Sequence, residues 1–122
     1  MERIRRRRFE RLVAHALRDL PDAVQRMLNN VAVVVEDQPS SEHLAEMDGD
    51  TLFGLYQGVP LTERGSGYSM VLPDKITIFR RSIEEACSTP RQIENEVRIT
   101  VIHELAHHLG IDEDRLEELG WQ

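Results

Sequence analysis

The sequence predicts a small α+β domain, and three features of its 122 residues predict that class. Helical periodicity marks both ends of the chain, and short segments in the middle have the composition of strands. The apolar fraction of 40% is enough for one hydrophobic core. Grouped strands that precede the longest helix favour a small, twisted, mostly three-stranded sheet with helices packed on it. We therefore expect one domain over residues 1–122, with a basic helical segment at 1–30.

Two helices are expected at the N-terminal end, over residues 4–19 and from Asp22 to about Leu28. Pro21 interrupts the first helix. The second can start here, because proline is tolerated in the first turn of a helix and Asp22 suits the positive end of the helix dipole. The candidate buried positions of the first helix are Ile4, Val13, Ala16, Leu17 and Leu20.

Three segments read as strands. Residues 31–35 are an apolar, mostly β-branched run that predicts a buried strand. Residues 51–57 form a weaker strand, expected at a sheet edge because Gly54 interrupts it. Residues 75–80 alternate between polar and apolar side chains. We expect a surface loop at 38–50 and a long loop at 58–73, and the strand order does not follow from the sequence.

The strongest predicted helix runs from Pro90 to the residue before Gly110. Thr89 can cap it, proline suits the first helical position, and Gln92 completes a capping box. Its apolar stripe comprises Ile93, Val97, Val101, Leu105 and Leu109, widened by Ile102 and Ala106. Shorter helices are expected from Ser82 to about Cys87, where Ser82 and Glu85 have a capping-box spacing, and over 113–119, where Leu116 and Leu119 face inward.

The most informative segment lies at the end of the long helix and reads His103-Glu104-Leu105-Ala106-His107. At roughly 100° per residue, the two histidines fall about 40° apart on the helix surface, so both imidazoles can reach one ion. In the H-E-x-x-H pattern of zinc hydrolases, two histidines hold the metal and the glutamate acts on its bound water. We predict His103 and His107 as ligands and Glu104 as the general base.

An acidic third ligand is expected after the turn at Gly110. Glu113 is the tenth residue after His103, which is the position of the third ligand in longer metal-protease signatures. Asp114 is the alternative ligand, and Asp112 is expected to cap the following helix. An acid in the first turn of a helix can also simply interact with its dipole.

The run from His103 to Asp114, the segment Arg115 to Trp121 and the upstream run Leu55 to Arg64 resemble the minimal zincins, a family of small zincin-like metallopeptidase domains. The likeness extends from about residue 31 onward. It implies a zincin-like layout, in which the site helix lies under the sheet and a cleft follows an edge strand. It also implies one zinc ion per chain, which a purified sample can lack, and a peptide or protein substrate.

The chain departs from the family pattern in two ways. Many relatives carry aspartate where this chain has Glu113, which leaves Glu113 and Asp114 as competing ligands. The methionine turn of longer metzincins is absent, because the last methionine is Met70. Trp121 is a candidate to pack beneath the site. His108, Tyr68 and Tyr56 are candidates for support around the metal or in the transition state, although His108 should point away from the ion.

Two further functions compete with hydrolysis. A zincin-fold binding or regulatory module with a silent metal site is one. The other is nucleic-acid or partner binding through the N-terminal segment, where residues 1–30 hold eight arginines against four acids. We favour a solvated helix face there, because no motif of a nucleic-acid module accompanies the arginines. Residues 31–122 hold seven basic and eighteen acidic residues.

Cys87 is the single cysteine and cannot form an internal disulfide. No apolar run approaches the roughly 20 residues that span a bilayer, and no secretion signal is visible. We therefore expect a cytoplasmic protein without a membrane segment. A homo-oligomer is compatible with this interpretation.

Overall fold

The computed structural model describes residues 2–46, 53–58 and 73–118. In chain order, its elements are α1 (Glu2–Arg18), α2 (Asp22–Met27), a 3₁₀ turn (Leu28–Asn30), β1 (Val31–Glu36), α3 (Ser41–Glu46), β2 (Gly54–Gln57), β3 (Asp74–Phe79), α5 (Arg80–Ala86), α6 (Pro90–Leu109) and α7 (Glu113–Glu118). The predicted α+β class is confirmed. None of the described helices is long and apolar enough to cross a membrane.

The strands form a sheet in the order β1-β3-β2, with β1 parallel and β2 antiparallel to the central β3. The predicted edge position of the strand containing Gly54 is confirmed. The strand at 31–35 was expected to be buried, but its side chains are only half-buried because β1 is the other edge. Sequence composition cannot distinguish an edge from a centre when a strand has the same β-branched residues in both places.

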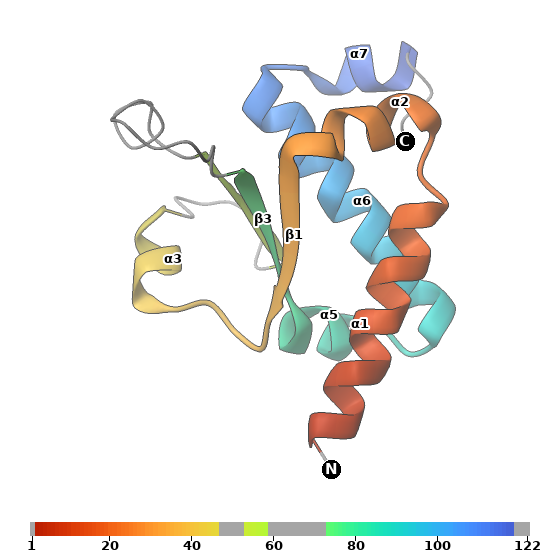
Figure 1. The fold of residues 1–122 in the computed structure, drawn as a ribbon, viewed down its shortest axis with the longest axis vertical. Helices are drawn as coiled ribbons and strands as arrows, with labels where there is room; N and C mark the ends of the chain where they lie inside the picture. Colours follow the sequence, from red (N-terminus) through yellow and green to blue (C-terminus); the bar gives the residue numbers. More distant parts are fainter. Residues whose placement is uncertain (1, 47–52, 59–72, 119–122) are drawn as a thin grey trace.

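Helices cover the two faces of the sheet unequally (Figure 1). α1 and α6 lie on one face, and α3 lies on the other. Ile76 and Ile78 of β3 belong to the main core with the helices, whereas Phe79 forms a separate cluster with Leu55. The His43 ring of α3 lies 5.3 Å from the Phe79 ring. The fully packed members of the main core are Phe9, Val13, Ala16, Leu20, Val24, Ile76, Ile78, Ile83, Val97, Val101, Ile102, Leu105, Ala106 and Leu116.

Most of the core positions predicted for the described helices are buried, and three are not. Leu109 was expected in the buried stripe of α6 but is 50% exposed, because the whole last turn of the helix, residues 107–110, is exposed. Leu17 and Ile93 are only half-buried, and both pack against the main core. The side chains of Ile4 and Leu119 lie outside the described residues, as does the central part of the predicted 58–73 loop.

Two local predictions were wrong. The loop expected at 38–50 contains helix α3, which begins where the Ser40 hydroxyl accepts the His43 amide at 3.2 Å while His43 Nδ1 accepts the Ser40 amide at 3.1 Å. This is a capping box in which histidine replaces the usual glutamate. α5 begins at Arg80 and not at Ser82, because the chain turns into a helix directly after β3 ends.

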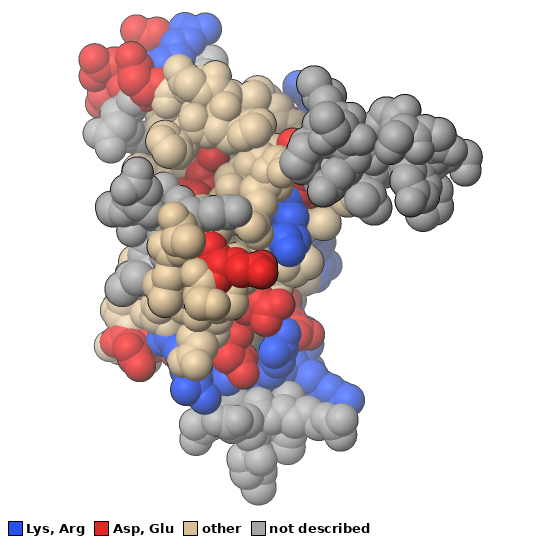
Figure 2. Space-filling model, turned by 90° about the vertical axis from the view of Figure 1, so that its left-hand side faces the viewer, with Lys and Arg blue, Asp and Glu red and all other residues tan. Residues whose placement is uncertain are grey.

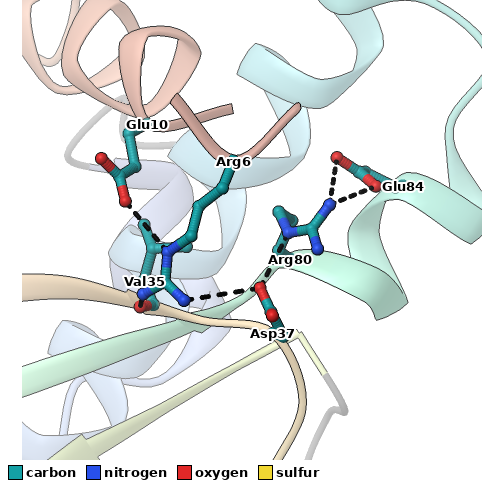
Figure 3. A network of polar contacts seen from close by, with 6 residues as sticks. All are labelled: Arg6, Glu10, Val35, Asp37, Arg80 and Glu84. Carbon is teal, nitrogen blue, oxygen red and sulfur yellow. Dashed lines mark hydrogen bonds and ion pairs between the residues drawn. The ribbon is translucent and has the colours of Figure 1, made fainter. Parts of the chain in front are cut away.

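A polar network closes the end of the sheet at which β3 runs into α5 (Figure 3). Arg80 is 3% exposed; its Nε donates to Asp37 Oδ1 at 2.9 Å and its Nη1 donates to Glu84 at 3.2 Å. Arg6 of α1 lies 3.6 Å from the same Asp37 oxygen. Arg6 also donates to the Val35 carbonyl of β1 at 2.5 Å. We call these contacts the Arg80 network; they tie α1, the end of β1 and α5 together.

Candidate functional site

Helix α6 carries the predicted motif in its C-terminal half. The Thr89 hydroxyl accepts the Gln92 amide at 3.2 Å, so the predicted cap is confirmed. The helix ends at Gly110, whose φ of 73° is left-handed, a conformation that favours glycine. The Ile111 amide donates to the Ala106 carbonyl at 2.8 Å, which closes the turn in the manner of a Schellman motif. This turn separates the two histidines of the motif from the acids of α7.

Two pairs of side chains, each four residues apart, occupy this end of α6. His103 and His107 are both exposed, whereas Glu104 is 3% exposed. Residues four apart lie on one helix face, so His103 pairs with His107 and Glu104 pairs with His108. The helical repeat sets the two pairs about 100° apart. His103 and His107 therefore face solvent. Glu104 and His108 face the neighbouring strand β2, although the His108 side chain is still 42% exposed.

The Glu104 carboxylate contacts the backbone of that strand. Its Oε1 accepts the main-chain N–H of Tyr56 at 3.0 Å. A buried carboxylate requires such a donor, because removing a charge from water without hydrogen bonds costs several kcal/mol. The close approach of strand and helix depends on Gly54, where an added Cβ would lie 2.6 Å from the Thr100 methyl group.

The Tyr56 side chain is held on the same side of α6. Its ring stacks on the His108 ring, with the centroids 3.9 Å apart and the planes at 16°. Its hydroxyl donates to Asp74 Oδ2 at 2.7 Å, and that oxygen lies 4.0 Å from His108 Nε2. The hydroxyl proton of Tyr56 is thus directed at Asp74, the first residue of β3. His108 thus lies against both Tyr56 of β2 and Asp74 of β3.

Asp74 was not singled out in the sequence. It precedes an alternating strand and follows a proline, which gives no signal for a role beside a motif that lies thirty residues further along. Only the antiparallel register, in which Tyr56 pairs with Ile76, brings the tyrosine close to the start of β3.

The structure describes the side chains of some, but not all, of the acidic residues that follow Gly110. Asp112 caps α7, as predicted, because its Oδ1 accepts the Arg115 amide at 2.9 Å. Asp114 is exposed, and the Glu113 side chain lies outside the described residues. Among the side chains that the structure does describe, no three from His, Cys, Asp and Glu form a group that could hold a metal ion. The choice of Glu113 or Asp114 as third ligand therefore stays a prediction.

The donor chemistry still fits a metal in part. His103 and His107 present two imidazoles on one exposed face, and imidazole is an ordinary zinc ligand. Tyr68 and Trp121, the other candidates for supporting the site, lie outside the described residues. Cys87 is half-buried, and burial raises the pKa of its thiol, so it lacks the character of a reactive thiolate.

Among the side chains that the structure describes on the basic N-terminal helix, one arginine is paired with acids. Arg6 is engaged with Glu10 at 3.1 Å and with the Arg80 network. Figure 2 shows a different side of the molecule, the one on which α3 lies, and there basic and acidic side chains lie beside one another toward both ends. Charges of alternating sign are typical of a solvated surface.

Comparison with known proteins places the chain in a family. A family model described as zincin-like metallopeptidase matches residues 28–121. No curated protein matches the chain. One solved structure, a conserved hypothetical protein from T. thermophilus, is 25% identical with a TM-score of 0.49, and the match covers 84% of this chain and 91% of that one.

Proposed function

Because the chain belongs to the zincin-like metallopeptidase family, we propose that it hydrolyses peptide bonds with a zinc ion bound at the end of α6. The observation that carries the proposal is the arrangement on this helix. Two exposed histidines share one face, and a buried glutamate lies on the adjacent face, against an edge strand. This spacing matches the H-E-x-x-H pattern, in which two histidines bind zinc and the glutamate acts on its bound water.

His103 and His107 are the proposed nitrogen ligands. Glu113 is the proposed oxygen ligand, and Asp114 is the alternative. With three protein ligands, the site would still have room for a water molecule or a substrate, as in catalytic zinc sites. When bound, zinc supplies Lewis acidity that polarises a carbonyl and lowers the pKa of a coordinated water toward about 7.

Glu104 is the proposed general base. Its carboxylate accepts the proton of the attacking water and returns it to the leaving amine. Glu104 is 3% exposed, so few bulk water molecules can form hydrogen bonds with its carboxylate. The Tyr56 amide holds Oε1, which restricts the orientations that the carboxylate can adopt.

The test joins zinc content with cleavage of unfolded casein. The unmutated protein should bind one zinc ion and cleave, and Glu104→Gln should keep the zinc and lose cleavage by about 10²–10⁴-fold, the usual contribution of a general base. Zinc binding without cleavage in the unmutated protein would instead identify the silent binding module.

The ligand assignment has its own matched controls. His103→Ala should lose zinc, whereas His15→Ala, which removes an exposed histidine of α1, should retain it. Glu113→Ala and Asp114→Ala alter adjacent residues. The variant with the larger loss of zinc affinity identifies the third ligand. Zinc affinity that stays at the unmutated level in both variants would contradict an acidic ligand from either position.

A further inference from the structure

Tyr56 makes two contacts with the same face of α6. Its main-chain N–H donates to Glu104 Oε1 at 3.0 Å, and its ring stacks on His108 at 3.9 Å between centroids. Glu104 and His108 are four residues apart, so the two contacts lie one above the other on the helix. Asp74 adds a third contact, because it accepts the Tyr56 hydroxyl at 2.7 Å.

The Tyr56 amide is not needed by the sheet. The Phe79 amide donates to the Phe53 carbonyl at 2.9 Å, which shows that Phe53 turns its main-chain groups toward β3. In an antiparallel pair, successive residues turn their main-chain groups alternately toward and away from the partner strand. Tyr56 therefore turns its N–H away from β3, and that N–H meets Glu104. The strand β2 offers α6 an edge donor without losing a hydrogen bond of the ladder.

We propose that Tyr56, His108 and Asp74 are positioning residues that aim the Glu104 carboxylate. The inference rests on the proposed function, in which Glu104 is the base. His108 and Asp74 fix the ring of Tyr56, the ring fixes the backbone of β2 at this residue, and the backbone N–H fixes Oε1. A catalytic group misplaced by about 1 Å can lose on the order of 10²-fold in rate, so loosening this chain of contacts acts on turnover.

The first experiment varies the ring at position 108 in the zinc-loaded protein. His108→Gln removes the stacked ring, His108→Phe restores a flat ring, and His15→Gln is the matched control on α1. We expect kcat on a casein-derived peptide to fall about tenfold in His108→Gln, with KM and the melting temperature unchanged. His108→Phe should recover most of the loss. A fall in His108→Phe as large as in His108→Gln would overturn the role of stacking.

The second experiment weakens the remaining anchor. Tyr56→Phe keeps the ring and the amide but loses the hydroxyl that donates to Asp74, and Asp74→Asn alters the acceptor. Each variant should lower kcat about threefold, and the double variant should lose no more than either single one, because residues that act as a unit are non-additive. Full additivity would show that the two residues act separately and would contradict the proposal.

NMR of the Tyr56 amide proton tests the positioning of Glu104 independently of whether the protein cleaves peptides. The amide proton of Tyr56, donated to a carboxylate, should shift upfield in Glu104→Gln and exchange faster with solvent in His108→Gln, and it should return toward its original position in His108→Phe. An unmutated protein that cleaves nothing overturns the hydrolase function, while these shifts still decide the positioning. A Tyr56 amide unmoved in both Glu104→Gln and His108→Gln overturns the positioning itself.

Discussion

The two ends of β3 hold buried charged groups by different means. Arg80, which follows the last residue of β3, is 3% exposed and is matched by the carboxylates of Asp37 and Glu84. Glu104, equally buried, accepts the main-chain amide of Tyr56, an edge-strand residue that pairs with Ile76 in the first half of β3. The charge of the Arg80 guanidinium is balanced by the two carboxylates that it contacts. The Glu104 carboxylate accepts a hydrogen bond from the strand and lies within one helical turn of two exposed imidazoles, where we propose that it acts as a base. The same degree of burial supports the structure at one end and the proposed chemistry at the other.

The largest expected effect comes from removing the buried cation at the Arg80 end. Arg80→Met leaves Asp37 and Glu84 without their shared partner, and breaking a buried pair costs about 3–5 kcal/mol. We expect about 3 kcal/mol, the lower limit, because both carboxylates are about a third exposed. Urea denaturation measures it, with Arg11→Met, an exposed arginine of α1, as the control. A loss equal to that of the control would show that the network contributes nothing to stability.

Zinc should stabilise the other end. A ligand that binds only the folded state adds about 2.7 kcal/mol when its free concentration is one hundred times its Kd. Thermal unfolding with and without zinc should show this gain in the unmutated protein and in Arg80→Met, but not in His103→Ala. A gain that persists in His103→Ala would place zinc elsewhere and would remove the contrast between the two ends.

Gly54 tests how closely the strand must approach the site helix. In Gly54→Ala, the new Cβ would meet the Thr100 methyl group at 2.6 Å and the Thr77 carbonyl oxygen at 3.0 Å. Overpacking of this kind costs about 1–3 kcal/mol. Thr100→Ser removes the methyl group, so the double variant should recover part of the loss in urea denaturation. No recovery would indicate that the Thr77 carbonyl, and not the helix, sets the limit.

The smallest effect is a pH dependence specific to the Arg80 end. The hydrogen bond from Arg80 lowers the pKa of Asp37, and the charges of Arg80, Arg6 and Arg81 act in the same direction, whereas burial opposes them. The folded pKa is therefore below the unfolded value of about 3.9, so this carboxylate stabilises the fold above pH 4 and loses that contribution as the pH falls through the folded pKa. The stability difference between the unmutated protein and Asp37→Asn should shrink below pH 4. A constant difference between pH 2 and 6 would contradict the shift.

Local patterns predicted the elements well where the responsible residues lie within four positions of one another. Thr89, Gln92 and Gly110 defined both ends of α6, and Asp112 was correctly expected to cap α7. The same reasoning missed α3, because its cap uses His43 in place of an acid. It also misplaced Leu109 in the core, since periodicity shows which face of a helix is apolar but not how far the helix extends beyond its neighbours.

In the candidate site, too, the local helix spacing could be predicted from the sequence and the long-range contacts could not. The alternation of His103, Glu104, His107 and His108 around α6 follows from 3.6 residues per turn and needs no other part of the chain. The partners of Glu104 and His108 do not follow, because Tyr56 is 48 residues from Glu104 in sequence. Asp74 joins them only through the antiparallel pairing of β2 with β3.

The sequence alone determined the long helix, its caps and the two side-chain pairs at its end, because backbone geometry and capping act over one turn. Only the tertiary structure decided which pair faces solvent, which strand supplies the amide to Glu104, and that Arg80 and Asp37 meet. Those contacts depend on the strand order β1-β3-β2 and on packing between segments far apart in the chain. Long-range packing is a property of the whole chain, whereas a helical turn is a property of a few neighbouring residues.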